Sequence, residues 1–433
     1  MAVGTKFPAA SSRLRLDDRR PEANLETVLA LSLALLAFAP EDAWYEAFRP
    51  LDDLQTRIET IATEYDVASA FDVGTSIEGR EIRGLRITAA PLGTAPPAVL
   101  ILGTQHAREW LSPMVTTCIA EHLAAGDAGS ELLERLEFLF VPVVNPDGYL
   151  YSWESDRFWR ANRRPGGGVD LNRNWATMFG LGTGGAGSQT YPGPAAFSEP
   201  ETAAIVDLAN AHDVVVFVDY HAPVNLVLIP FAFTSDPGPR EATQLEWGEA
   251  MSAAIESVNG LPHDVRKPGA GMPSGGLAQD WFADEQGALA FTIELRGGGA
   301  SGFDPPADVI LPACAENWAG FLELAQRASA AYGVDPPAGT TGGVDDTTGQ
   351  PSTTDETGPT PPSATNTGTT SSAGGQSDGP DLETTPHTDD ADAADGSEND
   401  DGCGCRTRSH GPGFLGPCIV LTVAGVRRRR TPS

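Results

Sequence analysis

The sequence predicts an α/β fold with a mixed, mostly parallel central sheet and helices on both of its faces. Three apolar runs rich in Val, Ile and Phe occupy residues 98–104, 136–145 and 213–221, and each ends in polar or turn residues. Such continuous runs suit strands that are buried on both faces. Helix-like segments at 112–126 and 198–212 separate them. Repeated strand–helix units of this kind are typical of a layered α/β domain.

The elements follow one another in a regular order. Residues 51–65 predict a helix, because their Leu and Ile residues recur at helical spacing. The helices expected at 112–126 and 198–212 open with Ser or Ser-Glu-Pro and close near Gly or Asn. A further apolar run at 288–296 predicts another strand near the end of the folded part.

Composition divides the 433 residues into four segments. Residues 44–332 form the expected folded domain, with apolar runs, short turns and aromatic residues throughout. Residues 333–401 are rich in Thr, Ser, Gly, Pro and acidic residues and contain no Lys or Arg, which predicts a disordered linker. Residues 1–43 and 402–433 are the expected N-terminal signal segment and C-terminal sorting tail. The linker supplies much of the formal charge of −31, and this acidity argues against nucleic acid as a partner.

The N-terminal segment predicts export. Basic residues precede the apolar run 28–39, which is too short to span a bilayer and fits the apolar region of a secretory signal. Glu26 before the run and Pro40 after it are unfavourable details, and the alternative is a buried helix of the domain.

The C-terminal tail predicts attachment to the cell surface. Cys403 and Cys405 precede a short apolar stretch, 414–426, and then four arginines, 427–430. This layout resembles the myxobacterial C-terminal sorting signal of the MYXO-CTERM type, which implies sorting to the outer membrane. An apolar stretch closed by arginines is also an anchoring layout on its own terms. The alternative is a disordered basic tail.

Two cysteines of the domain, Cys118 and Cys314, would be able to pair in an oxidising compartment, but spacing leaves their state open.

Polar residues that suit a metal site follow the expected strands. His106 and Glu109 lie three residues apart after the run 98–104, and His221 ends the run 213–221. Ligands in open α/β sheets bind beyond the carboxyl ends of strands, so these side chains and Glu294 are expected to converge at one edge. Two imidazoles and a carboxylate leave a fourth corner open for water, as a catalytic zinc site requires.

Seven motifs occur in a fixed order along the chain: HAREW, VPVVNPDGY, FWRANRR, GVDLNRNW, FSEPE, FVDYH and FTIELR. In this order they resemble the zinc carboxypeptidases of the M14 type, and the resemblance covers about residues 51–330. It implies that His106, Glu109 and His221 bind one Zn²⁺ per chain. It further implies that Asp170 orients the first histidine and that Glu294 is the general base.

The resemblance also implies residues that hold the substrate. Arg160 would polarise the scissile carbonyl and stabilise the developing oxyanion. Asn172 and Arg173 would bind the terminal carboxylate, to which a guanidinium is well matched. Arg108 would line the cleft, and Gln279 would help to select the terminal side chain, although a glutamine there indicates no particular class.

One position departs from the family pattern. The family commonly has a Tyr in a loop that closes over the substrate, about nine residues before the Trp of an Asp-Trp pair. Counting back from Trp281 reaches Met272, and no Tyr is near. The lid and its hydrogen bond are therefore in doubt, and substrate binding should suffer more than the chemical step.

The same residues also have structural interpretations. His221 would then be a hydrogen-bonded core histidine, Glu294 would pair with Arg296, and Asp170 would pair with Arg173. The remaining histidines of the domain, His122, His212 and His263, have no partner motif and are expected to be structural.

The sequence thus predicts a secreted or surface-held zinc exopeptidase that acts on peptides or proteins with a free C-terminus. Two alternatives remain at this stage. The first is a related amidase that acts on cell-wall peptides or modified side chains, and the second is a catalytically silent surface binding module.

Overall fold

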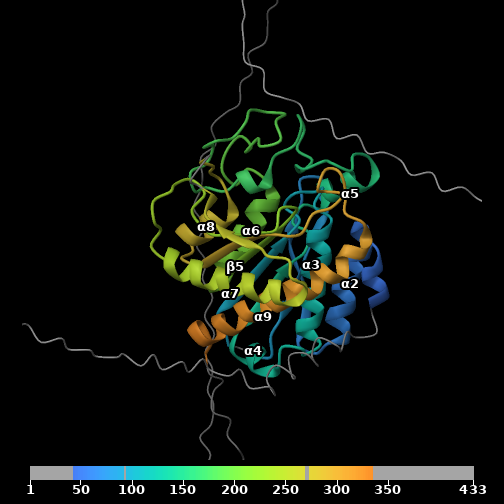
Figure 1. Ribbon diagram of the computed structural model, residues 1–433. Helices are drawn as coiled ribbons and strands as arrows, with labels where there is room; N and C mark the ends of the chain where they lie inside the picture. The colour runs from blue at the N-terminus through green and yellow to red at the C-terminus, as the bar shows by residue number, and fades with distance from the viewer. Residues whose placement is uncertain (1–41, 92–93, 269–272, 335–433) are drawn as a thin grey trace, which may run out of the picture. The chain divides into compact units, whose positions relative to one another are not determined.

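The structure, a computed structural model, describes residues 42–91, 94–268 and 273–334 (Figure 1). The apolar run 28–39, Met272, most of the expected linker and the C-terminal tail lie outside the described residues. The predictions for these segments and the four segment boundaries therefore stay predictions. No helix in the described part of the chain is long and apolar enough to cross a membrane.

An eight-stranded sheet runs through the described residues. In spatial order its strands are β1 (Ala68–Thr75), β2 (Glu81–Ile87), β4 (Glu137–Val141), β3 (Ala98–Gly103), β5 (Val214–His221), β8 (Leu289–Glu294), β6 (Leu226–Leu228) and β7 (Asp264–Arg266). The central strands β4, β3, β5 and β8 are mutually parallel, as are β6 and β7. The pairs β1–β2, β2–β4 and β6–β8 are antiparallel. The predicted mixed, mostly parallel sheet is confirmed.

Helices cover both faces of this sheet (Figure 1). The first face carries α2 (Leu51–Glu64), α3 (Leu111–Ala124), α4 (Ser130–Arg135), α5 (Pro146–Glu154), α7 (Glu241–Asn259) and α9 (Ile310–Tyr332), whose buried residues join one apolar cluster. The second face carries α6 (Pro200–Ala211) and α8 (Ala278–Asp284), which join a separate cluster. Short 3₁₀ helices are η1 (Asp42–Glu46), η2 (Leu171–Arg173) and η4 (Ala307–Val309).

Strand β3 shows why its sequence is apolar throughout. Val99 and Ile101 belong to the first cluster, whereas Leu100 and Leu102 belong to the second. Successive side chains of a strand point to opposite faces, so a strand covered on both sides needs apolar residues at every position. This burial fixes the strand whose end carries the first site residues.

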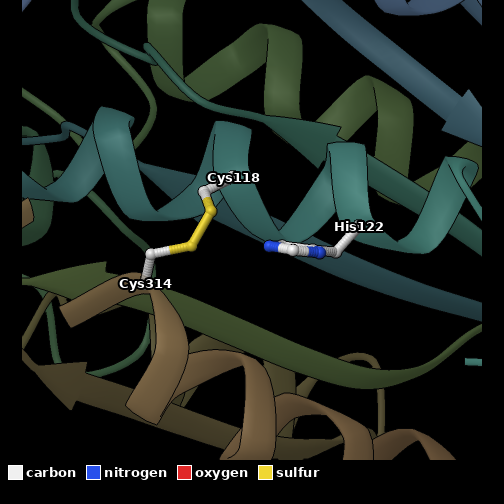
Figure 2. Close-up of side chains that lie close together, drawn as sticks. All are labelled: Cys118, His122 and Cys314. Carbon is white, nitrogen blue, oxygen red and sulfur yellow. A yellow bond between two sulfur atoms is a disulfide. The ribbon is translucent and has the colours of Figure 1, made fainter. Parts of the chain in front are cut away.

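A disulfide joins two helices of the first face. Cys118 of α3 and Cys314 of α9 are bonded, and their Cα atoms are 6.2 Å apart. The His122 ring lies beside the bond (Figure 2). Its Nδ1 atom is 2.6 Å from Asp127 Oδ2. The two sulfur atoms and this histidine are close enough to hold a metal ion. While the sulfur atoms are bonded to each other they are not thiolates, so the cluster serves as a covalent tie between α3 and α9.

The carboxyl ends of β3, β5 and β8 lie side by side. Gly103 of β3 pairs with Tyr220 of β5, and His221 of β5 pairs with Glu294 of β8. The backbone therefore brings the predicted site residues to one end of the parallel strands, as expected.

Candidate metal centre and active site

The chain leaves β3 through a tight turn that sets the direction of His106. Thr104 adopts a left-handed backbone conformation, with φ 57°. Its hydroxyl donates to Pro142 O at 2.8 Å, and its N–H donates to Ser112 Oγ at 2.9 Å. A non-glycine residue holds this strained conformation only where its surroundings over-determine it, and such residues cluster at functional sites.

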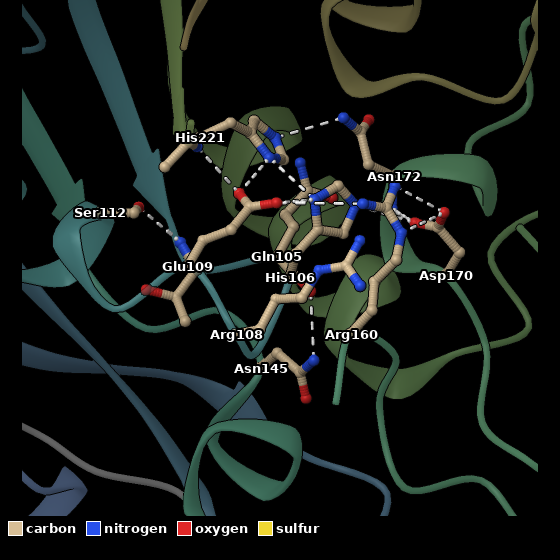
Figure 3. A network of polar contacts seen from close by, with 12 residues as sticks. Gln105, His106, Arg108, Glu109, Ser112, Asn145, Arg160, Asp170, Asn172 and His221 are labelled. Atoms are coloured by element: carbon tan, nitrogen blue, oxygen red, sulfur yellow. Dashed lines mark hydrogen bonds and ion pairs between the residues drawn. The ribbon is translucent and has the colours of Figure 1, made fainter. Parts of the chain in front are cut away.

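The side chains of His106, Glu109 and His221 meet at one point (Figure 3). His106 Nδ1 is 2.9 Å from Glu109 Oε1, and His221 Nδ1 is 2.9 Å from Glu109 Oε2. The two Nδ1 atoms are 3.0 Å apart. All three residues are buried, with at most 4% of their surface exposed.

The donor set fits a zinc ion. Ligand atoms in a tetrahedral site with bonds of about 2.0–2.2 Å lie roughly 3.3–3.6 Å from one another. The two Nδ1 atoms and the carboxylate oxygens of Glu109 lie 2.9–3.0 Å apart, slightly closer than this, and require only a small outward adjustment. Two nitrogen atoms and one carboxylate, with no thiolate, are the donors of a hydrolytic zinc site. The three predicted ligands are therefore placed together as a candidate zinc site.

A carboxylate holds the far nitrogen of each histidine. Asp170 Oδ1 is 2.9 Å from His106 Nε2, as the sequence predicted. Asp219 Oδ2 is 2.8 Å from His221 Nε2, and this partner was not predicted. Each carboxylate accepts the Nε2 proton and leaves the Nδ1 lone pair free for a metal ion. The signal for Asp219 was present in the sequence, because residues two apart on a strand share a face.

Electrostatics at the ligands favour a positive charge. Burial opposes the charged form of His221, but the carboxylates of Asp219 and Glu109 raise its pKa well above the usual value. Burial likewise opposes ionisation of Glu109, yet the neighbouring His106 and His221 lower its pKa. The cluster therefore attracts a cation in the space that the three ligands enclose.

Arg160 lies beside the ligands but is bound to Asp170. Its Nε and Nη2 atoms donate to Asp170 Oδ2 at 3.0 and 2.9 Å, while Nη1 stays 3.9 Å from Glu109 Oε1. Burial opposes its charge, but Asp170 and Glu109 raise the pKa of Arg160. The structural alternative of an Asp170–Arg173 pair is not observed among the described residues.

Arg173 carries a partly buried guanidinium that has no carboxylate partner in the part of the chain that the structure describes. Its Nη1 atom donates to Asn172 O at 2.5 Å, and within the described ranges no Asp or Glu oxygen lies within ion-pair distance. Burial, with the nearby positive charge of Arg160, lowers the pKa of Arg173. A charge held in this way attracts an anion from outside the protein. Asn172 is fixed beside it, since its Oδ1 accepts from Ala278 N at 2.9 Å.

Glu294 ends β8 beside His221, with its Oε2 atom buried and without a hydrogen-bond partner in the described part of the chain. Burial and the negative charge of Glu109 raise the pKa of Glu294 to about 7. A carboxylate with these properties suits a general base that works near neutral pH. The alternative pairing with Arg296 is not observed, because Arg296 binds Glu316 instead.

The two remaining predicted site residues are Arg108 and Gln279. Arg108 Nη1 donates to Gln189 Oε1 at 2.9 Å, and its guanidinium lies 4.1 Å from the ring centre of Phe303. Gln279 of α8 is buried, and its Oε1 atom has no partner among the described residues. The predicted position without a Tyr, Met272, lies outside the described residues.

The other histidines have structural surroundings. His212 Nδ1 is 2.6 Å from Glu137 Oε1 at the amino ends of β4 and β5, away from the candidate site. His122 lies beside the disulfide (Figure 2). His263 is buried, and burial lowers its pKa.

Comparison with known proteins gives matches across this part of the chain. A profile of the zinc carboxypeptidase family, M14, matches residues 54–320. A metallocarboxypeptidase A-like protein of Trichophyton verrucosum is 34% identical over 298 residues, which cover 65% of this chain and 71% of that protein. Carboxypeptidase B of Astacus astacus is 32% identical over 298 residues, which cover 65% of this chain and 97% of that protein.

Solved structures are similar over the same region. Carboxypeptidase A from Helicoverpa armigera has a TM-score of 0.63 and 27% identity, and the match covers 71% of this chain and 82% of that chain. Bovine thrombin-activatable fibrinolysis inhibitor, in complex with tick carboxypeptidase inhibitor, has a TM-score of 0.60 and 26% identity. That match covers 66% of this chain and 99% of the bovine chain.

Proposed function

Because this chain belongs to the zinc carboxypeptidase family, we propose that the site at the ends of β3, β5 and β8 is its catalytic centre, with the residue roles given below. The protein is a zinc-dependent hydrolase that removes residues from the C-terminus of peptides. The family and its relatives favour this activity over the amidase and the silent binding module.

His106, Glu109 and His221 would hold the metal through two Nδ1 atoms and one carboxylate. When bound, zinc supplies a Lewis acid that polarises the scissile carbonyl and makes water a stronger nucleophile. Asp170 and Asp219 keep both imidazole rings turned with Nδ1 inward.

Glu294 handles the proton. Its unpartnered Oε2 atom accepts a proton from the attacking water and passes it to the nitrogen of the leaving residue. A pKa of about 7 keeps a useful share of the side chain ionised at neutral pH and still allows the proton to be returned.

Two arginines divide the substrate charges between them. Asp170 occupies Nε and Nη2 of Arg160, so Nη1 is the group that faces the ligands and donates to the oxygen of the scissile carbonyl. Arg173, with Asn172 beside it, binds the terminal carboxylate of the substrate. The observation that carries this proposal is the partly buried guanidinium of Arg173, which has no carboxylate within ion-pair distance among the described residues and lies near three candidate zinc ligands.

The decisive experiment compares N-blocked dipeptides that end in a free carboxylate with the same dipeptides ending in a carboxamide. The zinc-loaded protein should release the C-terminal residue from the acids, and a chelator should abolish the release. The amides should be poor substrates, because they carry no charge for Arg173. Equal cleavage of acids and amides, or cleavage that survives chelation, would contradict the proposed roles. Varying the last residue would also rank the side chains that the site accepts near Gln279.

We further propose that the protein is exported and held at the cell surface. Support comes from the sequence alone, namely the basic and apolar run that ends at residue 39 and the Cys-apolar-Arg tail at 402–433. Cell fractionation of the full chain and of a variant lacking residues 402–433 tests this. The full chain should be found with the outer membrane and the shortened chain in the medium. Equal distribution of the two would remove the sorting role from the tail.

A further inference from the structure

Asp219 is a buried carboxylate to which neither the sequence motifs nor the comparisons gave a role. It lies in β5, two residues before His221, and is fully buried. Its Oδ2 atom lies 2.8 Å from His221 Nε2 and 2.5 Å from the Nε2 atom of Gln105. Gln105 directly precedes the other histidine ligand, His106. One carboxylate oxygen thus connects the two chain segments that carry the imidazole ligands.

Trp175 fixes the orientation of the Gln105 amide, which in turn hydrogen-bonds to Asp219. Its indole Nε1–H, which is only a donor, is 3.1 Å from Gln105 Oε1. The Gln105 oxygen must therefore face Trp175, and its amide nitrogen must face Asp219. Asp219 Oδ2 accepts this hydrogen bond and also accepts from His221 Nε2–H. Because the carboxylate of Asp219 only accepts, His221 Nε2 carries the proton and Nδ1 is left bare for the metal, while the indole of Trp175 fixes the amide of Gln105 that holds Asp219.

Trp175 is itself immobilised. It is fully buried, and its ring lies 5.4 Å from that of Trp281 and 5.6 Å from that of Phe282, measured between centroids. Gln105 is fully buried as well, and its backbone oxygen accepts from Asn145 Nδ2 at 3.1 Å. The hydrogen-bonded chain therefore starts from a rigid part of the second apolar cluster.

The carboxylates behind the two histidines differ in charge compensation. Asp170 binds the guanidinium of Arg160, so its negative charge is largely neutralised. Asp219 has no Lys or Arg within ion-pair distance among the described residues, and its Oδ1 atom has no hydrogen-bond partner there. Its charge therefore acts on His221 and on whatever cation His221 binds.

We propose that Asp219, held in place by a hydrogen bond from Gln105, is a positioning residue. Its negative charge acts through His221 and raises the affinity of the site for zinc. With Glu109, Asp219 supplies two negative charges, which match the two positive charges of the ion. The inference rests on the proposed function, because it takes the three-residue cluster to be a zinc site. It adds that the two imidazole ligands have unequal electrostatic support.

Two variants separate the charge from the hydrogen bonds. Asp219→Asn keeps an oxygen that accepts from both Gln105 and His221 but removes the charge. Gln105→Met removes the hydrogen bond to Asp219 and leaves the charge. Zinc affinity is measured on the full chain by competition with a chromophoric chelator. We expect Asp219→Asn to weaken binding about 10–100-fold, the usual effect of losing such an outer partner, and Gln105→Met to weaken it less.

Thr292→Val is the matched control. Thr292 lies opposite Asp219 on β8, is buried, and has an Oγ1 atom without a partner among the described residues. The substitution changes a polar atom at the same depth without touching the His221–Asp219–Gln105 chain, so zinc affinity should stay within about twofold of wild type.

A second readout separates this role from a merely structural one. Asp219→Asn replaces a buried charge with a neutral side chain of nearly the same shape that still accepts both hydrogen bonds, so the metal-free variant should unfold close to the wild-type temperature. Added zinc should then raise the unfolding temperature less than it does for wild type. A structural residue would instead lower the stability of the metal-free protein and leave the increment from zinc unchanged.

If Asp219→Asn binds zinc as tightly as wild type does, the inference is wrong, but the proposed carboxypeptidase function is unaffected. A loss in Gln105→Met that equals or exceeds the loss in Asp219→Asn would overturn the role of the charge. Failure of the wild-type protein itself to bind zinc would overturn the proposed function and this inference together.

Discussion

Glu294 is the residue on which the chemical step depends most. The replacement Glu294→Gln keeps the size and burial of the side chain but removes its ability to accept a proton. We expect kcat to fall about 10²–10⁴-fold, the usual contribution of a general base, with zinc content near one per chain. Steady-state kinetics and metal analysis of the same preparation check this. Loss of zinc from the variant would mean that Glu294 is a ligand instead of the base.

Arg173 should control recognition of the free C-terminus. The replacement Arg173→Met should lower kcat/KM for dipeptide acids by about 10²-fold or more, because hydrogen bonds to charged groups contribute about 1.5–3 kcal/mol each. Hydrolysis of the dipeptide amides should change little, so the preference for acids should shrink. Arg163→Met is the control, since that guanidinium is stacked 3.6 Å from the centre of the Tyr151 ring. An undiminished preference for acids would assign the carboxylate to another residue.

Asp280 should make stability depend on pH. Burial raises the pKa of Asp280 to about 7, above its usual value of 3.8. The folded state therefore holds a proton that the unfolded state has released, and the free energy of unfolding falls as pH rises from about 4 to about 7. Wild type should lose about 2–3 kcal/mol of unfolding free energy between pH 5 and pH 8 through this group, and Asp280→Asn should not show this loss.

Urea unfolding at the two pH values measures this difference. The oxygen of Asn at 280 keeps an acceptor for the N–H of Ala232, which donates to both carboxylate oxygens of Asp280. Glu249→Gln, at an exposed position of α7, is the control and should leave the pH dependence unchanged. Parallel curves for Asp280→Asn and wild type would show that Asp280 is ionised in the folded protein.

The sequence predicted the residues whose signal is local. His106 and Glu109 are three apart after a strand, and His221 ends another strand, so spacing and strand position were enough to find them. The binding of Arg160 to Asp170 was not predicted, because nine residues of irregular chain lie between the two and only tertiary packing brings them together. Asp219 was visible in the motif FVDYH, but nothing in one strand shows that Gln105 will meet it.

At the scale of elements, the disulfide between α3 and α9 should be a major stabilising link. It closes a loop with a sequence separation of 196, so it strongly restricts the unfolded chain. Replacing both cysteines with alanine should lower the free energy of unfolding by about 2–5 kcal/mol. Equilibrium unfolding in urea checks this, and zinc binding should persist because neither cysteine touches the metal ligands. Unchanged stability would show that packing between the helices is sufficient.

The elements that the sequence predicted are those with a strong period or a long apolar run. The helix expected at 51–65 is α2, and those expected at 112–126 and 198–212 are α3 and α6, displaced by one or two residues at their ends. The three-residue strands β6 and β7 were not predicted, because their order comes from pairing with β8 and with each other. Antiparallel β1 and β2 are partly exposed and lack a continuous apolar run.

For the whole molecule, zinc should raise thermal stability. The ion binds the folded site and has little affinity for the separated ligands of the unfolded chain, so it shifts the equilibrium towards the folded state. Chelation should lower the unfolding temperature by several degrees, and added zinc should restore it. Differential scanning calorimetry measures both steps. His221→Ala should show no such shift, and a shift of wild-type size in that variant would place the zinc elsewhere.

The bond between Cys118 and Cys314 also decides what a single cut does to this enzyme. Asp170, Arg173, His221 and Glu294 all lie within the ring that the bond closes, whereas His106 and Glu109 lie just before it. A protease that nicks one exposed loop anywhere between 119 and 313 therefore leaves both pieces covalently attached. On a denaturing gel they would migrate as one band until a thiol is added. One hydrolysed peptide bond within the ring therefore does not release half of the active site.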